Sequence, residues 1–140
     1  LASLPVGLEI GKSLSLEGCN GLSRLPDDLS RIKGDLVIAD CSNLEALPTS
    51  LVVECTLNLC GCTSLASLPD ELHVGKGLYL SWCTNIVSLP TNMIVGGDLD
   101  VVNCVNLNSF PAVILCWPQI PKSRKVFIYG SGLSIESKEW

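Results

Sequence analysis

The stretch 68–90 reads LPDELHVGKGLYLSWCTNIVSLP and decides the fold, because it holds one full copy of a unit that recurs along the chain. Leucine-proline steps follow one another at intervals of 21 or 22 residues, at Leu4-Pro5, Leu25-Pro26, Leu47-Pro48, Leu68-Pro69 and Leu89-Pro90, with Phe110-Pro111 as a variant. A cysteine lies 14 residues after each of the first five prolines, or 15 in the second unit: Cys19, Cys41, Cys62, Cys83 and Cys104. Self-similarity at a fixed period of roughly 20 to 50 residues is typical of a solenoid.

Each unit carries a short alternation of apolar and polar residues just before its cysteine. In the fourth unit, Leu78 and Leu80 flank Tyr79, and Cys83 follows three residues later. Alternation with a period of two predicts a strand with one buried face. Stacking of the units then predicts inward columns made of Leu16, Ile38, Leu59, Leu80 and Val101 with the five cysteines beside them, each turned inward toward backbone groups of the loop.

The segment after each proline is predicted to be extended or polyproline-like rather than helical. Proline fixes its own φ and disfavours a helical conformation for the residue before it. An apolar pair follows, such as Leu72 and Val74, and Gly75 then allows the chain to turn back toward the next strand. The second unit carries its extra residue in this return segment, near Arg31.

The pattern LxLxxCxxLxxLP resembles the leucine-rich repeat, whose consensus is LxxLxLxxN/CxL. Residues 14–22 (LSLEGCNGL) match most of that consensus, although its first leucine is replaced by Gly11, Lys33, Glu54, Gly75 and Gly96 in successive units. The resemblance covers residues 1 to about 110 and extends both to bacterial repeats, including those of secreted effectors, and to repeats of plant intracellular immune receptors. It implies a right-handed solenoid of the α/β horseshoe class that is β-dominated, with a parallel sheet on the concave face, an extended or polyproline-like convex side and little helix.

We interpret residues 1–140 as a single leucine-rich-repeat domain with about five regular repeats over 1–110 and an irregular C-terminal repeat or cap over 111–140. The run after Pro111 is too long for the pattern, and KVFIYGSGL at 125–133 then restores a strand. There we expect Val126 and Ile128 to point inward, Ser131 to take the cysteine position, and the open end to be covered by aromatic residues, namely Trp117, Phe127 and Trp140.

The amino end of the array shows no comparable cap. An open strand edge there would be liable to pair with another chain, so self-association through this end is an alternative that the sequence leaves open.

Composition restricts the partner and the compartment. A net charge of -5 and a pI near 4.7 argue against nucleic acid, which requires clustered basic residues. No apolar run approaches the roughly 20 residues that span a bilayer. Of the eight cysteines, five hold one repeated position, which favours small, buried, free thiols over disulfides. Free thiols predict a reducing compartment, either cytoplasmic or the host cytosol of an injected effector.

The sequence gives no support for catalysis, a metal or a cofactor. Cys55, Cys60 and Cys62 form a CxxxxCxC pattern, but strand alternation turns Cys60 outward and Cys62 inward, whereas zinc needs converging ligands. The single histidine, His73, belongs to the return segment and cannot join a nucleophile-histidine-acid set. Asp98 and Asp100 resemble an acid-base pair in spacing, yet we expect both in an open, wet concavity with nothing to separate their pKa values. We therefore do not expect catalysis there.

The outward positions of the sheet carry the functional hypothesis. An aromatic anchor with polar neighbours is typical of interface hot spots, and acidic residues outnumber basic ones on this face, so a basic protein partner is expected. The competing interpretation treats Tyr79 and Trp82 as isolated exposed aromatics, with Trp82 covering a loop. The predicted partner-binding residues on the concave face are Asn58, Tyr79, Ser81, Trp82, Asp98, Asp100, Val102 and Asn103.

We therefore expect a non-enzymatic module that binds a protein partner. One alternative is the substrate-recognition arm of a larger enzyme or secreted effector, for example a ligase, whose catalytic domain is not in this sequence. Another is a structural or self-associating repeat array. The full-length open reading frame separates a stand-alone binding module from a recognition arm. Sedimentation over a range of concentrations tests the self-associating array.

Overall fold

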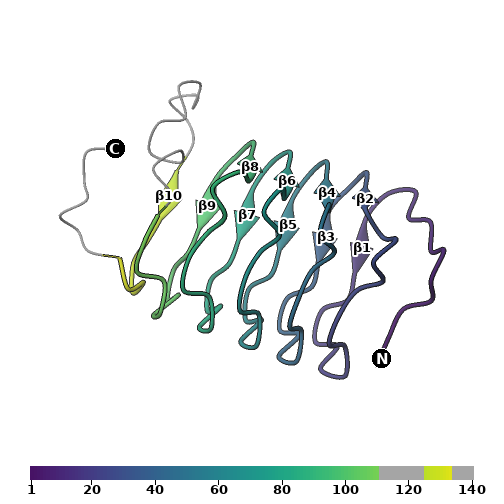
Figure 1. Ribbon diagram of the computed structural model, residues 1–140, viewed down its shortest axis with the longest axis horizontal. Coiled ribbons are helices and arrows are strands. Elements are labelled where there is room, and N and C mark those ends of the chain that lie inside the picture. The colour runs from purple at the N-terminus through teal and green to yellow at the C-terminus, as the bar shows by residue number, and fades with distance from the viewer. Residues whose placement is uncertain (111–124, 134–140) are drawn as a thin grey trace.

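The computed structural model describes residues 1–110 and 125–133, which form coils stacked side by side in one row (Figure 1). The described residues contain strands and turns but no helix. The chain is therefore a parallel-strand solenoid with turns of about 21 residues. We number the coils from proline to proline: coil 1 is 5–25, coil 2 is 26–47, coil 3 is 48–68, coil 4 is 69–89, coil 5 is 90–110, and coil 6 is described over 125–133.

One parallel sheet of six strands takes one strand from each coil, in the order β1-β3-β5-β7-β9-β10. Equivalent residues pair directly, so that Leu57 faces Leu78 and Leu78 faces Leu99. The predicted columns are therefore confirmed. The strands are β1 Leu14–Ser15, β3 Leu36–Val37, β5 Leu57–Asn58, β7 Leu78–Tyr79, β9 Leu99–Asp100 and β10 Val126–Phe127.

A second parallel sheet lies on another side of the coils, where the sequence predicted only an extended or polyproline-like segment. The chain is extended there, but it also pairs from coil to coil, because β-branched residues such as Val53 and Val95 favour a pleated, half-buried surface. This sheet contains four strands in order: β2 Arg31–Ile32, β4 Val52–Val53, β6 His73–Val74 and β8 Ile94–Val95. Single bridges between Arg24 and Ala46 and between Ser88 and Ser109 link further points of neighbouring coils.

The space inside the coils is filled by aliphatic side chains at equivalent positions. In coil 4, Leu72, Leu78, Leu80 and Ile86 are all fully buried. No polar or charged residue is buried among the described residues. Each coil thus adds a thin layer to one continuous apolar core, as the repeated sequence pattern predicted.

The repeated cysteines join each coil to the one before it. In coils 2 to 5, the cysteine Sγ donates a hydrogen bond of 2.9–3.0 Å to a main-chain carbonyl oxygen, in the pairs Cys41–Leu16, Cys62–Ile38, Cys83–Leu59 and Cys104–Leu80. The carbonyl of Leu59 also accepts the N–H of Cys62 at 3.1 Å, so both of its lone pairs are used. The predicted meeting of thiols with backbone groups is confirmed.

Burial keeps these thiols protonated. Desolvation is the largest cause, and it raises the pKa of Cys62 to about 12 and that of Cys104 to about 11. The pKa values of Cys41 and Cys83 are raised by the same cause. A protonated, buried thiol is a hydrogen-bond donor rather than a nucleophile, so this row is structural.

Coil 6 continues the repeat after the break in the pattern. β10 pairs with β9, Ile128 packs against the core, and the N–H of Ser131 bonds to the oxygen of Ile128 as Cys104 does to Val101. Ser131 therefore holds the cysteine position, as predicted. Val126 pairs with the inward Leu99, as predicted, and it is still 37% exposed because among the described residues it has a paired strand on only one side. Trp117 and Trp140 of the predicted cover lie outside the described residues.

Candidate functional site

The predicted binding residues come together on the outer face of the six-stranded sheet. Strand register places Asn58 beside Tyr79 and Tyr79 beside Asp100. Ser81 and Val102 follow two residues later on the same face, and Trp82 and Asn103 come next, at the corner where the strand ends. We call this set the coil 4–5 face: Asn58, Tyr79, Ser81, Trp82, Asp100, Val102 and Asn103.

Asp100 is held in a fixed position at the centre of this face. Its Oδ1 accepts the hydroxyl of Ser81 at 2.8 Å and the N–H of Val102 at 2.9 Å. Among the described residues, Oδ2 has no hydrogen-bond partner and Asp100 forms no ion pair. One oxygen therefore fixes the side chain and the other remains available for a ligand.

Asp98, also predicted to contact the partner, accepts a hydrogen bond from the next coil. Its Oδ1 accepts the N–H of Lys125 at 2.8 Å, and Asp35 accepts the N–H of Thr56 in the same way at 2.9 Å. Both carboxylates stand just before a strand and tie their coil to the next one. Asp98 contributes negative charge beside the coil 4–5 face, while its position is explained by coil stacking.

The ring of Tyr79 packs over Gly77, and no other described coil has a glycine at that position. A Cβ at Gly77 would lie 2.7 Å from Cε2 and 2.9 Å from the hydroxyl oxygen of the Tyr79 ring, so the ring lies where a side chain of residue 77 would be. Gly77 is accordingly buried. The equivalent residue in every other described coil carries a side chain, namely Ser13, Asp35, Thr56, Asp98 and Lys125. Coil 4 thus combines its single aromatic strand residue with the glycine that lets the ring rest on the sheet.

Trp82 adopts a backbone conformation that disfavours a large side chain. The residue before the cysteine position has a φ between 56° and 75° in all six coils: Gly18, Asp40, Gly61, Trp82, Asn103 and Gly130. Glycine, asparagine and aspartate populate this left-handed region most readily, whereas a bulky residue there is a conformational outlier. The tryptophan side chain is 58% exposed. The turn requires the positive φ, but nothing in the turn requires an indole.

Two more aromatics extend this face, and the sequence analysis did not include them in the site. Phe127 pairs with Asp100 across β9 and β10 and is 41% exposed, and Tyr129 is 83% exposed. The alternation in KVFIYGSGL predicts that both rings lie on the outer face, and Phe127 was in addition expected to contribute to the C-terminal cover.

The other chemical candidates remain separate from one another. Cys62 is buried in the cysteine row, whereas Cys60 is half-buried and burial raises its pKa. His73 lies on β6, in the other sheet. Across residues 1–110 and 125–133, no three histidine, cysteine, aspartate or glutamate side chains are grouped so that they could hold a metal ion.

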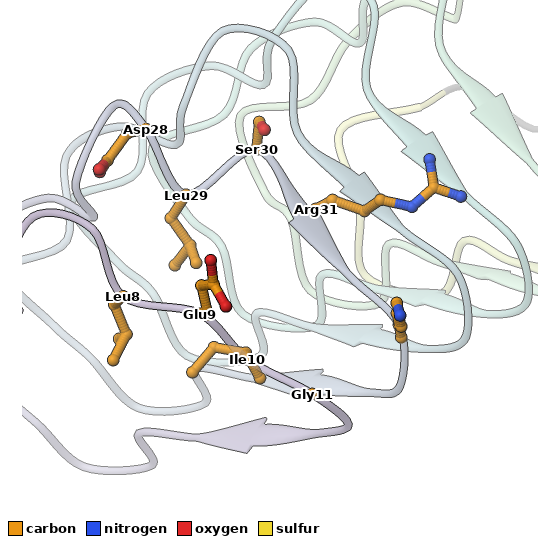
Figure 2. Close-up of a pocket in the computed structure, with 9 residues that line it drawn as sticks. Leu8, Glu9, Ile10, Gly11, Asp28, Leu29, Ser30 and Arg31 are labelled. Atoms are coloured by element: carbon orange, nitrogen blue, oxygen red, sulfur yellow. The ribbon is translucent and has the colours of Figure 1, made fainter.

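A cavity of about 510 Å³ lies away from the coil 4–5 face, between coils 1 and 2. Leu29 and Leu51 are 22 residues apart, whereas Ile32 pairs with Val53 at a separation of 21, so the extra residue of coil 2 falls between Leu29 and Ile32. Figure 2 shows the resulting gap between the segment 8–11 and β2, with the Arg31 side chain directed away from it. Arg31 instead forms an ion pair with Glu54 at 2.6 Å. The cavity follows from the length of coil 2.

Comparisons with known proteins returned no match to a family model, a curated protein or a solved structure. The described residues also include no helix long and apolar enough to cross a membrane. The site is therefore interpreted from its own residues.

Proposed function

We propose that this chain is a solenoid of the leucine-rich-repeat type that binds a protein partner through the outer face of its six-stranded sheet. The unit LxLxxCxxLxxLP and one parallel strand per coil support the family assignment. The free thiols of the described residues favour a reducing compartment. The coil 4–5 face supplies two aromatic residues with hydrogen-bonding groups around them, which is the usual composition of an interface hot spot.

The observation that carries this proposal is the conformation of Trp82. A bulky side chain with φ +65° costs about 1–2 kcal/mol relative to a residue that tolerates the left-handed region. Asp40 and Asn103 show that short polar residues fit the same corner in neighbouring coils. An exposed, unfavourable tryptophan is explained when it contributes to binding rather than to folding.

A capture experiment with a paired variant tests the proposal. Immobilised wild-type protein and the variant Tyr79→Ala/Trp82→Asn are exposed to an extract of the cells that express the protein, and bound proteins are compared by quantitative mass spectrometry. We expect at least one partner that the wild type retains and the variant loses by tenfold or more, since aromatic hot-spot residues contribute about 2 kcal/mol or more each.

A matched control comes from the other sheet. Ile94 is 54% exposed on β8, so Ile94→Ser changes an exposed apolar residue away from the coil 4–5 face. The control should capture the same partner as the wild type. If Ile94→Ser abolishes capture and Tyr79→Ala/Trp82→Asn does not, binding occurs elsewhere and the proposal is wrong.

A further inference from the structure

We propose that Asn20 is a site of spontaneous modification, at which the side-chain amide is hydrolysed through a succinimide formed with the main-chain nitrogen of Gly21. Asn20-Gly21 is the only asparagine-glycine step in the sequence. Glycine has no side chain to shield its nitrogen, so this step closes the succinimide ring more readily than any other asparagine step. The site belongs to coil 1 and is independent of the coil 4–5 face.

The reacting groups lie in a turn that leaves both of them accessible. Asn20 and Gly21 are the central residues of a turn that the N–H of Leu22 closes by donating to the oxygen of Cys19 at 3.0 Å. Both central residues are exposed. Among the described residues, neither the N–H of Gly21 nor the Nδ2 of Asn20 has a hydrogen-bond partner. The attacking nitrogen and the leaving nitrogen are therefore both free.

Most of the other asparagines are followed by a main-chain N–H that is already engaged. Leu44 donates to the oxygen of Cys41 at 3.0 Å, and Leu107 donates to that of Cys104 at 3.0 Å. Attack by either nitrogen would break a bond that closes a turn. The asparagines followed by such a donor are Asn43, Asn58, Asn85, Asn103 and Asn106, with bonds of 2.8–3.4 Å. The structure thus singles out Asn20 by its neighbour's free N–H as well as by sequence.

The conversion is a hydrolysis that needs only water. The Gly21 nitrogen loses its proton and bonds to Cγ of Asn20, while the bond from Cγ to Nδ2 breaks and Nδ2 leaves as ammonia. Water then opens the ring at one of its two carbonyl groups. One opening gives aspartate, and the other gives isoaspartate, in which the main chain runs through Cβ and Cγ. Either product takes up one water and releases one ammonia, and nothing is oxidised or reduced.

The two products differ in their effect on the contact between coils 1 and 2. Oδ1 of Asn20 accepts the N–H of Ser42 at 3.3 Å and its hydroxyl at 3.0 Å, and the main-chain oxygen of Asn20 accepts Nδ2 of Asn43 at 2.5 Å. Aspartate keeps all of these acceptors. Isoaspartate adds a carbon to the main chain inside the turn and displaces them. The isoaspartate product therefore loosens coil 1 from coil 2.

Peptide mapping of aged protein tests the site. The protein is incubated at neutral pH for several weeks, because the bonds from Ser42 restrain the side chain and slow ring closure. It is then digested and analysed by mass spectrometry with electron-transfer fragmentation, which distinguishes aspartate from isoaspartate. We expect both products at Asn20, while Asn43 and Asn106 remain asparagine. An unchanged Asn20, or equal conversion at all three asparagines, would overturn the inference.

Two variants separate the change in the main chain from the change in charge. Asn20→Asp carries the charge of the products on an unaltered main chain, and it should melt at the temperature of fresh wild-type protein. Asn20→Gln keeps the amide but would have to form a larger ring, so its melting temperature should not change during the incubation. Aged wild-type protein should contain a fraction that melts at a lower temperature. If that fraction is absent although isoaspartate has formed, the loosening of coil 1 is wrong.

Discussion

Trp82 and Cys83 are neighbours in the chain, and they belong to regions that follow different rules. Cys83 lies in the interior, where Cys41, Cys62 and Cys104 repeat its burial and its bond to the previous coil. Trp82 lies on the exterior, where its position has a uniform backbone conformation but holds glycine, aspartate or asparagine in the other described coils.

The difference shows which residues the fold selects and which it merely tolerates. Stacking demands a similar apolar side chain in every layer, because each inward residue contacts its counterparts in the neighbouring coils. The exterior demands only a permitted backbone angle, so side chains there can vary, and an unfavourable choice needs another reason. The following predictions test this contrast, beginning with the largest expected effect.

Substitution of Tyr79 on β7 and of Leu80 just after it should give very different losses of stability. Leu80→Ala removes a fully buried side chain and should lower the free energy of unfolding by about 2–5 kcal/mol. Tyr79→Ala removes an outward ring and should cost much less. Urea denaturation followed by circular dichroism measures both, and similar losses would contradict the division into interior and exterior.

Alkaline pH should destabilise the interior through the cysteine row. The raised pKa values of Cys62 and Cys104 mean that the folded protein keeps protons that the unfolded chain releases above the ordinary thiol pKa of 9.0. Stability is therefore complete below pH 9 and falls as the pH rises toward 11 and 12, on the order of 1–2 kcal/mol in total between pH 9 and 10.

Denaturant unfolding at pH 8, 9 and 10 measures this fall. Cys62→Ala should show a shallower decline with pH than the wild type, because one titrating thiol is removed. An identical decline in both proteins would mean that other groups cause the alkaline effect.

The contribution of the cysteine-carbonyl hydrogen bond to stability can be measured by comparing two coils. Cys83→Ala removes the thiol that bonds to Leu59 and leaves a small void, and it should cost about 1–2 kcal/mol. Cys19 holds the same position in coil 1, is only partly buried and donates no such bond to any residue that the structure describes, so Cys19→Ala should cost less than half as much. Equal losses of stability in the two variants would show that the thiol hydrogen bond contributes nothing beyond side-chain packing.

The smallest effect is expected for the exposed ion pair on the four-stranded side. Arg31 and Glu54 have side chains that are 62% and 38% exposed, so solvent screens their attraction. Arg31→Gln should lower the free energy of unfolding by less than about 0.5 kcal/mol in low salt. It should have no measurable effect in about 0.5 M sodium chloride, because the salt screens the attraction between the two charges. A larger, salt-independent loss would indicate that Arg31 also supports the wall of the cavity in coil 2.

The interior was predictable because it repeats. A 21-residue period identifies columns such as Leu16 to Val101 and the cysteine row without coordinates, and the position of the extra residue in coil 2 followed from the same count. The second sheet was missed because its segments follow a proline, which predicts an extended chain without deciding whether that chain pairs with its neighbours.

The exterior was predictable only in part. Outward positions of coils 3 to 5 followed from strand parity, but the seat of Tyr79 on Gly77 and the fixed oxygen of Asp100 depend on side-chain positions that no period encodes. The positive φ at the corner has a partial signal in the sequence, because five of the six corner residues are glycine, aspartate or asparagine, which tolerate it. Trp82 gives no such signal, and only the backbone shows that it shares the conformation.

The most direct test of this account is the free energy of unfolding of Trp82→Asn. Asparagine occupies the equivalent corner in coil 5 and tolerates the left-handed conformation, so the substitution relieves the backbone cost while removing a ring that is 58% exposed. The account predicts a stability equal to that of the wild type or higher by up to about 1 kcal/mol, together with loss of the partner. A stability loss of about 1 kcal/mol or more would contradict it, because the indole would then be part of the structure that it was inferred not to serve.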